Sequence, residues 1–147
     1  MKRIITIVFC FYSLVSFGQS DEEENQTVVF GRIGELTDEQ ISKSGSLKLN
    51  FVTDEEEAER LAKNDIKNRT PFLLLMSGVA PAIITTDSEF ENKYGVYFYE
   101  YGCGGPEHEV IIAYNRLIFN FLTKRYGSKW KEEVRDDVIG LIKFPRK

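Results

Sequence analysis

The first 18 residues constrain the fold most, because they have the pattern of a secretory signal peptide, which a mature protein loses. Two cations precede the apolar run 4–17, and residues 16–18 (Ser-Phe-Gly) place small side chains at positions −3 and −1 of a cleavage site before Gln19. The run of 14 residues is shorter than the roughly 20 that a membrane-spanning helix needs. We therefore expect a cleaved signal peptide rather than an uncleaved anchor, and an exported protein, periplasmic or secreted.

The charge of the chain argues against one broad class of partner. The sequence has 19 Lys and Arg against 23 Asp and Glu, a formal net charge of −4. Removing residues 1–18 takes away two cations and no acid, which leaves −6. Nucleic acid and anionic lipid require clustered positive charge, so we expect no nucleic-acid partner. No later apolar run approaches the length of a membrane span, so we expect none after signal cleavage.

Cysteine usage sets how the domain is stabilised. Cys10 lies in the signal peptide, so Cys103 is the only cysteine expected in the mature protein. A single cysteine forms no intramolecular disulfide, and stability has to come from a hydrophobic core. Free cysteine is among the most buried residue types, and we expect Cys103 to be buried. The alternatives are an intermolecular disulfide that links a homodimer, and a reactive or metal-binding thiol.

Two segments follow the signal peptide. Residues 19–26 contain no apolar side chain and four acids in succession, a composition typical of a disordered acidic leader. Residues 27–147 show no internal repeat and no second change in composition. Their length suits one hydrophobic core, so we expect a single domain.

Periodicity and capping signals predict a mixture of strands and helices. Residues 47–51 alternate apolar and polar side chains, as a half-buried strand does, whereas 72–76 is an unbroken apolar run typical of a strand covered on both faces. Thr37, Thr53 and Thr86 each begin a capping box. The predicted strands are 28–30, 47–51, 72–76, 82–85 and 96–101. The predicted helices are a short turn after Thr37, then 53–68, 86–94, 106–126 and 128–140.

The order of these elements suggests a topology. From residue 47 to residue 101 it is β-α-β-β-α-β, the order of the ferredoxin-like fold. The two C-terminal helices would cover or extend that core. The α+β class follows more directly from the pattern than this topology does. Neither predicts an activity, because such frameworks host many unrelated functions.

The loop that joins the last predicted strand to the long helix holds the only cysteine and the only histidine of the mature chain. Its glycines allow close approach of a ligand to the backbone, and a helix N-terminus can activate a thiol or hold an anion. The candidate catalytic residues are Cys103, His108, Glu107 and Glu109, with either glutamate orienting the imidazole. No nucleophile signature accompanies them. One thiol, one imidazole and a carboxylate also fall short of a four-ligand zinc site, so we expect no metal or other cofactor. We favour the alternative, a connection whose glycines serve only its geometry.

Three tyrosines form a second candidate site. Tyr97, Tyr99 and Tyr101 share one face of the predicted strand 96–101. Tyrosine supplies large, rigid contact area with a polar tip, which is typical of recognition surfaces. These residues are therefore candidate binding residues. The alternative, which we favour slightly, is the rim of a core beneath the long helix.

Several short segments carry a resemblance. Residues 90–94 (Phe-Glu-Asn-Lys-Tyr), the Tyr-Gly-Cys turn, and residues 126–130 and 137–141 resemble a group of short exported proteins from Bacteroidota, and so does the cleavage region 17–19. The likeness covers residues 70–141. It implies export and a single domain, and it implies no catalytic or binding residue.

Two functional hypotheses follow from the sequence. The first is a small exported, non-enzymatic binding module, such as an adaptor, an inhibitor or an immunity-type protein, whose partner is another protein or an envelope component. The second is a thiol- or metal-dependent enzyme that uses Cys103 and His108. The acidic surface and the tyrosine-rich strand favour the first.

Overall fold

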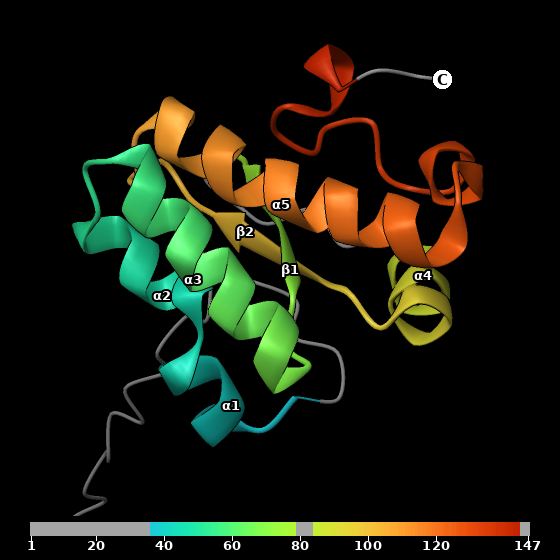
Figure 1. The fold of residues 1–147 in the computed structure, drawn as a ribbon, viewed down its shortest axis with the longest axis horizontal. Coiled ribbons are helices and arrows are strands. Elements are labelled where there is room, and N and C mark those ends of the chain that lie inside the picture. Colours follow the sequence, from blue (N-terminus) through green and yellow to red (C-terminus); the bar gives the residue numbers. More distant parts are fainter. Residues whose placement is uncertain (1–35, 79–83, 145–147) are drawn as a thin grey trace, which may run out of the picture.

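Two parallel strands lie side by side at the centre of the computed structural model, which describes residues 36–78 and 84–144 (Figure 1). Strand β1 (Phe72–Met76) pairs with β2 (Tyr97–Tyr101), so that Phe72 lies opposite Tyr97 and Met76 lies opposite Tyr101. Parallel strands need a long crossover connection. Here the connection contains helix α4 (Asp87–Tyr94), which Gly95 ends in a left-handed conformation with φ of 62°.

Two long helices cover one face of this strand pair (Figure 1). Helix α3 (Glu55–Asn68) begins where Asp54 accepts the Glu57 N–H at 2.8 Å, one residue later than the predicted Thr53 box. Helix α5 (His108–Tyr126) packs along α3 and ends before Gly127, whose φ is 72°. The remaining helical elements are short: α1 (Asp38–Lys43), α2 (Gly45–Lys48), η1 (Leu49–Phe51), η2 (Lys129–Glu132) and η3 (Leu141–Lys143).

The α+β class is confirmed, and so are several elements. The capping box at Thr37 starts α1, with Thr37 and Gln40 each bonded to the other's backbone N–H. The predicted helices 53–68, 86–94 and 106–126 are α3, α4 and α5 within two residues at each end. Both predicted strands at 72–76 and 96–101 are present, and the first four residues of β1 are buried.

In the described part of the chain, a side chain rather than a third strand bonds the Leu74 backbone on the side of β1 away from β2. The Asn115 side chain, which is fully buried in α5, accepts the Leu74 N–H at 2.9 Å and donates to the Leu74 carbonyl at 2.9 Å. Its amide also donates to the Ile139 carbonyl at 2.9 Å. The Ile139 N–H in turn donates to the Leu74 carbonyl at 3.3 Å. Buried backbone groups need such partners, and one side chain supplies them to two chain segments.

The predicted strand 47–51 is wrong, because this segment is helical in α2 and η1. A contact 20 residues away decides the outcome: Gly45 donates its N–H to both carboxylate oxygens of Asp65 in α3, each at 2.9 Å. A Cβ on Gly45 would lie 2.8 Å from Leu61 Cβ, so the first turn of α2 lies directly against α3. Burial does not alternate as a strand requires, since Phe51 is 90% exposed.

The predicted helix 128–140 is also wrong. The chain forms η2, then a turn, and then η3 after Gly140, whose φ is 83°. The Arg135 guanidinium donates to both carboxylate oxygens of Asp137, at 2.9 and 2.5 Å. Residues two apart point away from each other on a helix, so this pairing requires an irregular backbone.

Because of these two differences, the ferredoxin-like topology predicted from the sequence is wrong. Its first strand is helical, and the sheet formed by residues 36–78 and 84–144 is the single parallel pair β1-β2. Of the predicted strand 82–85, residues 82 and 83 lie outside the described ranges, and Ile84 and Thr85 are not in a strand. The signal peptide, the acidic leader and the strand 28–30 also lie outside these ranges. Among the described helices, none has the length and apolar character to cross a membrane.

Candidate functional site

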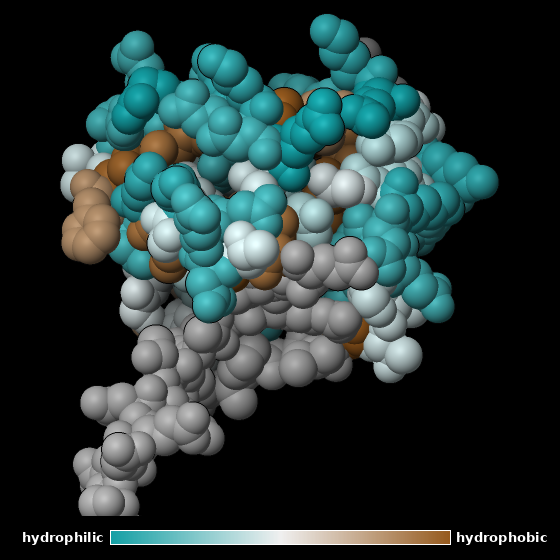
Figure 2. All heavy atoms as spheres, turned by 90° about the horizontal axis from the view of Figure 1, so that it is seen from below, coloured by the Kyte–Doolittle hydropathy of each residue, from teal (hydrophilic) through white to brown (hydrophobic). Residues whose placement is uncertain are grey.

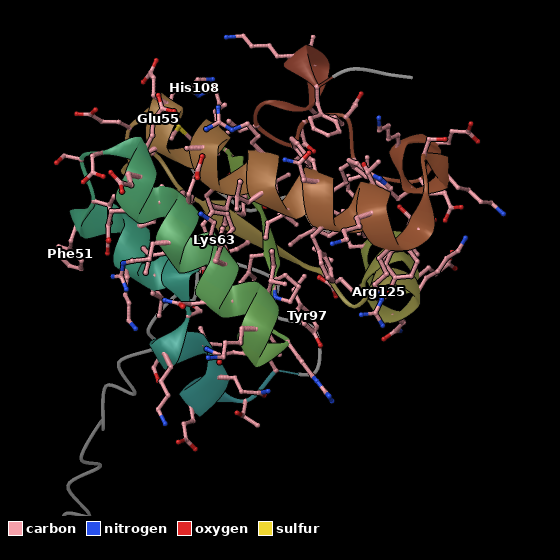
Figure 3. The ribbon with its side chains drawn as sticks, in the orientation of Figure 1. Phe51, Glu55, Lys63, Tyr97, His108 and Arg125 are labelled. Carbon is pink, nitrogen blue, oxygen red and sulfur yellow. The ribbon has the colours of Figure 1, made fainter. Side chains whose placement is uncertain are left out.

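The loop that holds the candidate catalytic residues lies on the surface, between β2 and α5. Cys103, Glu107, His108 and Glu109 are all exposed, and Figure 3 labels His108 at the start of α5. The expectation of a buried thiol is therefore wrong. The physical reason lies at Gly105, where a Cβ would come within 2.8 Å of Tyr101 Cβ. That glycine packs on the strand end, and the turn before it, with Cys103, projects outward.

The four candidate side chains do not form a catalytic cluster. Within residues 36–78 and 84–144, no hydrogen bond or ion pair joins the Cys103 thiol to the His108 imidazole or to either glutamate. The same residues include no group of three His, Cys, Asp or Glu side chains placed to hold a metal ion. The loop therefore contains residue types that occur in active sites, but it does not place their reactive atoms in contact with one another.

The tyrosines of β2 lie mainly in the core. Tyr99 and Tyr101 are only 7% and 4% exposed. Their rings meet edge to face with centroids 5.0 Å apart, and the Tyr101 hydroxyl donates to the Ser46 carbonyl. Burial raises the pKa of Tyr101 far above its usual range. Tyr97 differs from both, because it is only partly buried and lies at the edge of a hollow.

This hollow lies at the amino ends of β1 and β2 and has a volume of about 420 Å³. Helices α3, α4 and α5 all end here. Arg69, whose backbone is left-handed with φ of 62°, ends α3, and Gly95 and Gly127 end α4 and α5. We call it the amino-end pocket. Its walls carry two arginines, Arg69 and Arg125, and four aromatic rings, those of Tyr94, Tyr97, Phe121 and Tyr126.

The aromatic walls are tied to one another and to one arginine. The Arg125 guanidinium lies 5.5 Å from the centroid of the Tyr126 ring and 6.0 Å from that of Phe121. These distances are those of cation–π contacts. Tyr126 meets Tyr94 edge to face at 5.0 Å, and its hydroxyl donates to the Tyr94 carbonyl at 3.0 Å. Figure 3 shows Tyr97 and Arg125 on the same side of the molecule, between the last turn of α3 and α4.

The pocket is locally positive on an acidic protein. In the coloured part of Figure 2, hydrophilic residues surround smaller apolar areas. The whole chain has a formal net charge of −4. Arg69 and Arg125 are both exposed. The ion pairs within the described part of the chain include neither of them. Cations are stabilised at helix C-termini, which accounts for the presence of the two charges but not for the aromatic hollow between them.

The sequence gives little indication of this pocket. The pattern singles out Tyr97 as a binding candidate and Arg125 as a cation that suits the end of the long helix. Arg69 has no distinguishing neighbour in the sequence. The lining residues come from three separate segments, around 66–71, 94–97 and 121–126, and no spacing rule joins one segment to another.

Comparison with known proteins adds no relative to this description. No protein-family model matches the chain, and no curated protein or solved structure shows significant similarity to it.

Proposed function

We propose that this protein is an exported, non-enzymatic binding module that holds an anionic ligand in the amino-end pocket. The observation that carries the proposal is the pairing of Arg69 and Arg125 with four aromatic rings around one hollow. Export rests on the signal-peptide pattern of residues 1–18. The proposal keeps Tyr97 as a binding residue and assigns Tyr99 and Tyr101 to the core.

The dimensions of the pocket suit a small ligand or one end of a larger one. Ligand sites commonly enclose about 300 to 1,000 Å³ and combine apolar walls with a few polar groups. The amino-end pocket has about 420 Å³, with Ile66 and Pro71 adding apolar wall to the rings. Guanidinium groups bind carboxylates through charge-assisted, often bidentate, hydrogen bonds. An anion attached to an aromatic or apolar group therefore matches both kinds of wall.

The enzyme hypothesis has weaker support. Exposure of Cys103 satisfies one of its requirements. Its other requirement is a base within hydrogen-bond reach of the thiol, and the contacts of the described residues include no such pair. Binding through the pocket needs only groups that are already placed together.

The proposal is tested with phenylacetate, which joins an aromatic ring to a carboxylate. We expect ¹H–¹⁵N NMR shifts of the ¹⁵N-labelled protein on titration, confined to residues 66–71, 94–97 and 121–127. A double variant, Arg69→Ala with Arg125→Ala, should lose these shifts. The matched control is Lys67→Ala with Lys124→Ala, which removes the same charge from exposed neighbours on the same helices. The absence of shifts in the wild-type protein, or their persistence in the arginine variant, would overturn the proposal.

A further inference from the structure

We infer that the partner of the amino-end pocket is a second copy of this chain, which inserts Phe51 into the pocket and presents the neighbouring acids to Arg69 and Arg125. The inference rests on the proposed function and names the partner of the same pocket. The contact joins two different surfaces of one protein, so it assembles copies head to tail. Three observations carry it: the exposure of Phe51, the charges beside it, and the separation of the two surfaces.

Phe51 is an aromatic side chain that the folded chain leaves in solvent. It lies in η1 and is 90% exposed, whereas Leu49 in the same short element is fully buried. Figure 3 shows its side chain at the left edge of the molecule, directed away from the helices. Removing such a ring from water is favourable, and phenylalanine is among the residues enriched in protein interfaces. Phe51 is therefore placed to anchor a contact with another molecule.

Acids follow this ring in the chain and lie beside it in space. The acids that precede and form the first turn of α3 are Asp54, Glu55, Glu56 and Glu57. Phe51, Asp54 and Glu57 line one hollow of about 410 Å³. We call Phe51 and these four acids the Phe51 surface. The same hollow has two cations, Lys48 and Arg60, and the Arg60 guanidinium donates to Glu57 at 2.6 Å. Acids therefore outnumber cations around the ring.

Two of these acids match the two arginines of the amino-end pocket. Within residues 36–78 and 84–144, Asp54 and Glu56 take part in no ion pair, and neither do Arg69 and Arg125. All four residues are exposed. The described residues that line the pocket include four aromatic rings and no acid. A phenylalanine ring flanked by carboxylates therefore suits both the aromatic walls and the guanidinium groups.

The two surfaces lie at opposite ends of one helix. The Phe51 surface is at the start of α3, and Arg69 is the C-terminal cap of that helix. The helix has 14 residues, so at 1.5 Å per residue its ends are about 20 Å apart. Phe51 is therefore too far from the pocket of its own chain to enter it. An exposed apolar group and a complementary pocket elsewhere on the same molecule give a contact that does not close on two copies.

Sedimentation velocity of the whole protein tests the inference, with a reductant present because Cys103 is exposed. The sedimentation coefficient should rise with protein concentration, and added salt should weaken the association because it screens the charges. Phe51→Ser should weaken it about 10- to 100-fold, the loss expected when a buried aromatic side chain is removed. Ile142→Ser is the matched control, because Ile142 is also 90% exposed, and it should associate as the wild type does.

A mixture of two variants identifies which surfaces meet. Phe51→Ser keeps the pocket, and Arg69→Ala with Arg125→Ala keeps the Phe51 surface. Each variant alone should remain monomeric at concentrations at which the wild type associates. Their mixture should form a dimer of one copy of each and no larger species, because each copy retains one working surface. Lys67→Ala with Lys124→Ala removes the same charge from exposed neighbours and should assemble as the wild type does.

Three results would overturn the inference: a wild type that stays monomeric, unchanged association of Phe51→Ser, or a mixture that stays monomeric. Phenylacetate titration of Phe51→Ser tests the proposed function separately. Phenylacetate binding without self-association of the wild type overturns the inference alone, and the absence of both overturns both. Excess phenylacetate should also dissociate the wild-type assembly. An assembly that persists while phenylacetate binds would show that the contact lies elsewhere, and would overturn the inference too.

Discussion

Asn115 pairs with Leu74 as a neighbouring strand would, accepting from its N–H and donating to its carbonyl, both at 2.9 Å. Within residues 36–78 and 84–144, a single side chain thus makes the hydrogen bonds to Leu74 that a third strand would make. Because it also bonds the Ile139 carbonyl at 2.9 Å, it joins α5, β1 and the C-terminal segment.

Replacing Asn115 by leucine should destabilise the protein by about 2 to 4 kcal/mol. Leucine leaves the buried Leu74 N–H and Ile139 carbonyl without a partner, and each such group costs about 1 to 3 kcal/mol. The urea midpoint should fall while the slope of the transition stays constant. Asn120→Leu, at an exposed position of the same helix, is the control and should change stability by less than about 0.5 kcal/mol. Equal effects of the two changes would contradict this role.

Asp65 should make stability depend on pH in a direction opposite to that of most surface carboxylates. Burial raises the pKa of Asp65 above its ordinary 3.8, against the hydrogen bonds from Tyr114 at 2.6 Å and Gly45. The folded state therefore binds this proton more tightly than the unfolded state. Its stabilising contribution is present below pH 3.8 and is lost as the pH rises through the raised value.

The Asp65→Asn variant isolates this effect, because asparagine keeps the side-chain volume and one acceptor oxygen but does not ionise. The unfolding free energy of the wild type minus that of the variant should fall as the pH rises from 4 to 7. Urea denaturation at several pH values measures both. Parallel pH curves for the two proteins would show that Asp65 is not the titrating group.

Arg135 should be essential for the stability of the C-terminal segment. Its side chain is 5% exposed and pairs with the buried Asp87 at 3.2 Å as well as with Asp137. Arg135→Met keeps much of the apolar contact with Phe98, 5.8 Å from the guanidinium, but leaves Asp87 without this partner. Breaking a buried ion pair costs about 3 to 5 kcal/mol. Lys129→Met, at an exposed position of η2, is the control in thermal unfolding. A similar small loss in both variants would remove Arg135 from this role.

Cys103 should react in the native state. Its thiol is exposed, so a thiol reagent should label it stoichiometrically without denaturant. Non-reducing electrophoresis should show a disulfide-linked dimer after mild oxidation, and Cys103→Ser should abolish that dimer without lowering stability. Labelling only after unfolding would contradict the exposed position.

The sequence predicted those elements whose signals are local. Thr37, Gly95 and Gly127 mark helix ends through their own backbone or side-chain geometry, and the structure places the ends there. The strand at 72–76 could be predicted from the length of its apolar run and from the residues that flank it. By contrast, the shape of residues 45–51 depends on Asp65, which lies 20 residues from Gly45.

The candidate site was less accessible to sequence reasoning for a related reason. The loop 102–109 attracted interest because it gathers a cysteine and a histidine in sequence, yet their side chains lie on the surface without contact to each other among the described interactions. The amino-end pocket gathers Arg69, Tyr97 and Arg125 only in space. Ends of three helices meet there, and that meeting is a property of packing that periodicity does not encode.

The closure of β1 by Asn115 also bears on self-association. An open strand edge is a template for pairing with another chain. In the folded protein, Asn115 and Ile139 occupy the Leu74 backbone groups on that edge. If the C-terminal segment and α5 came away, β1 would expose an apolar, uncharged edge of the kind that aggregates. We therefore expect loss of the Asn115 amide to promote aggregation as well as to lower stability.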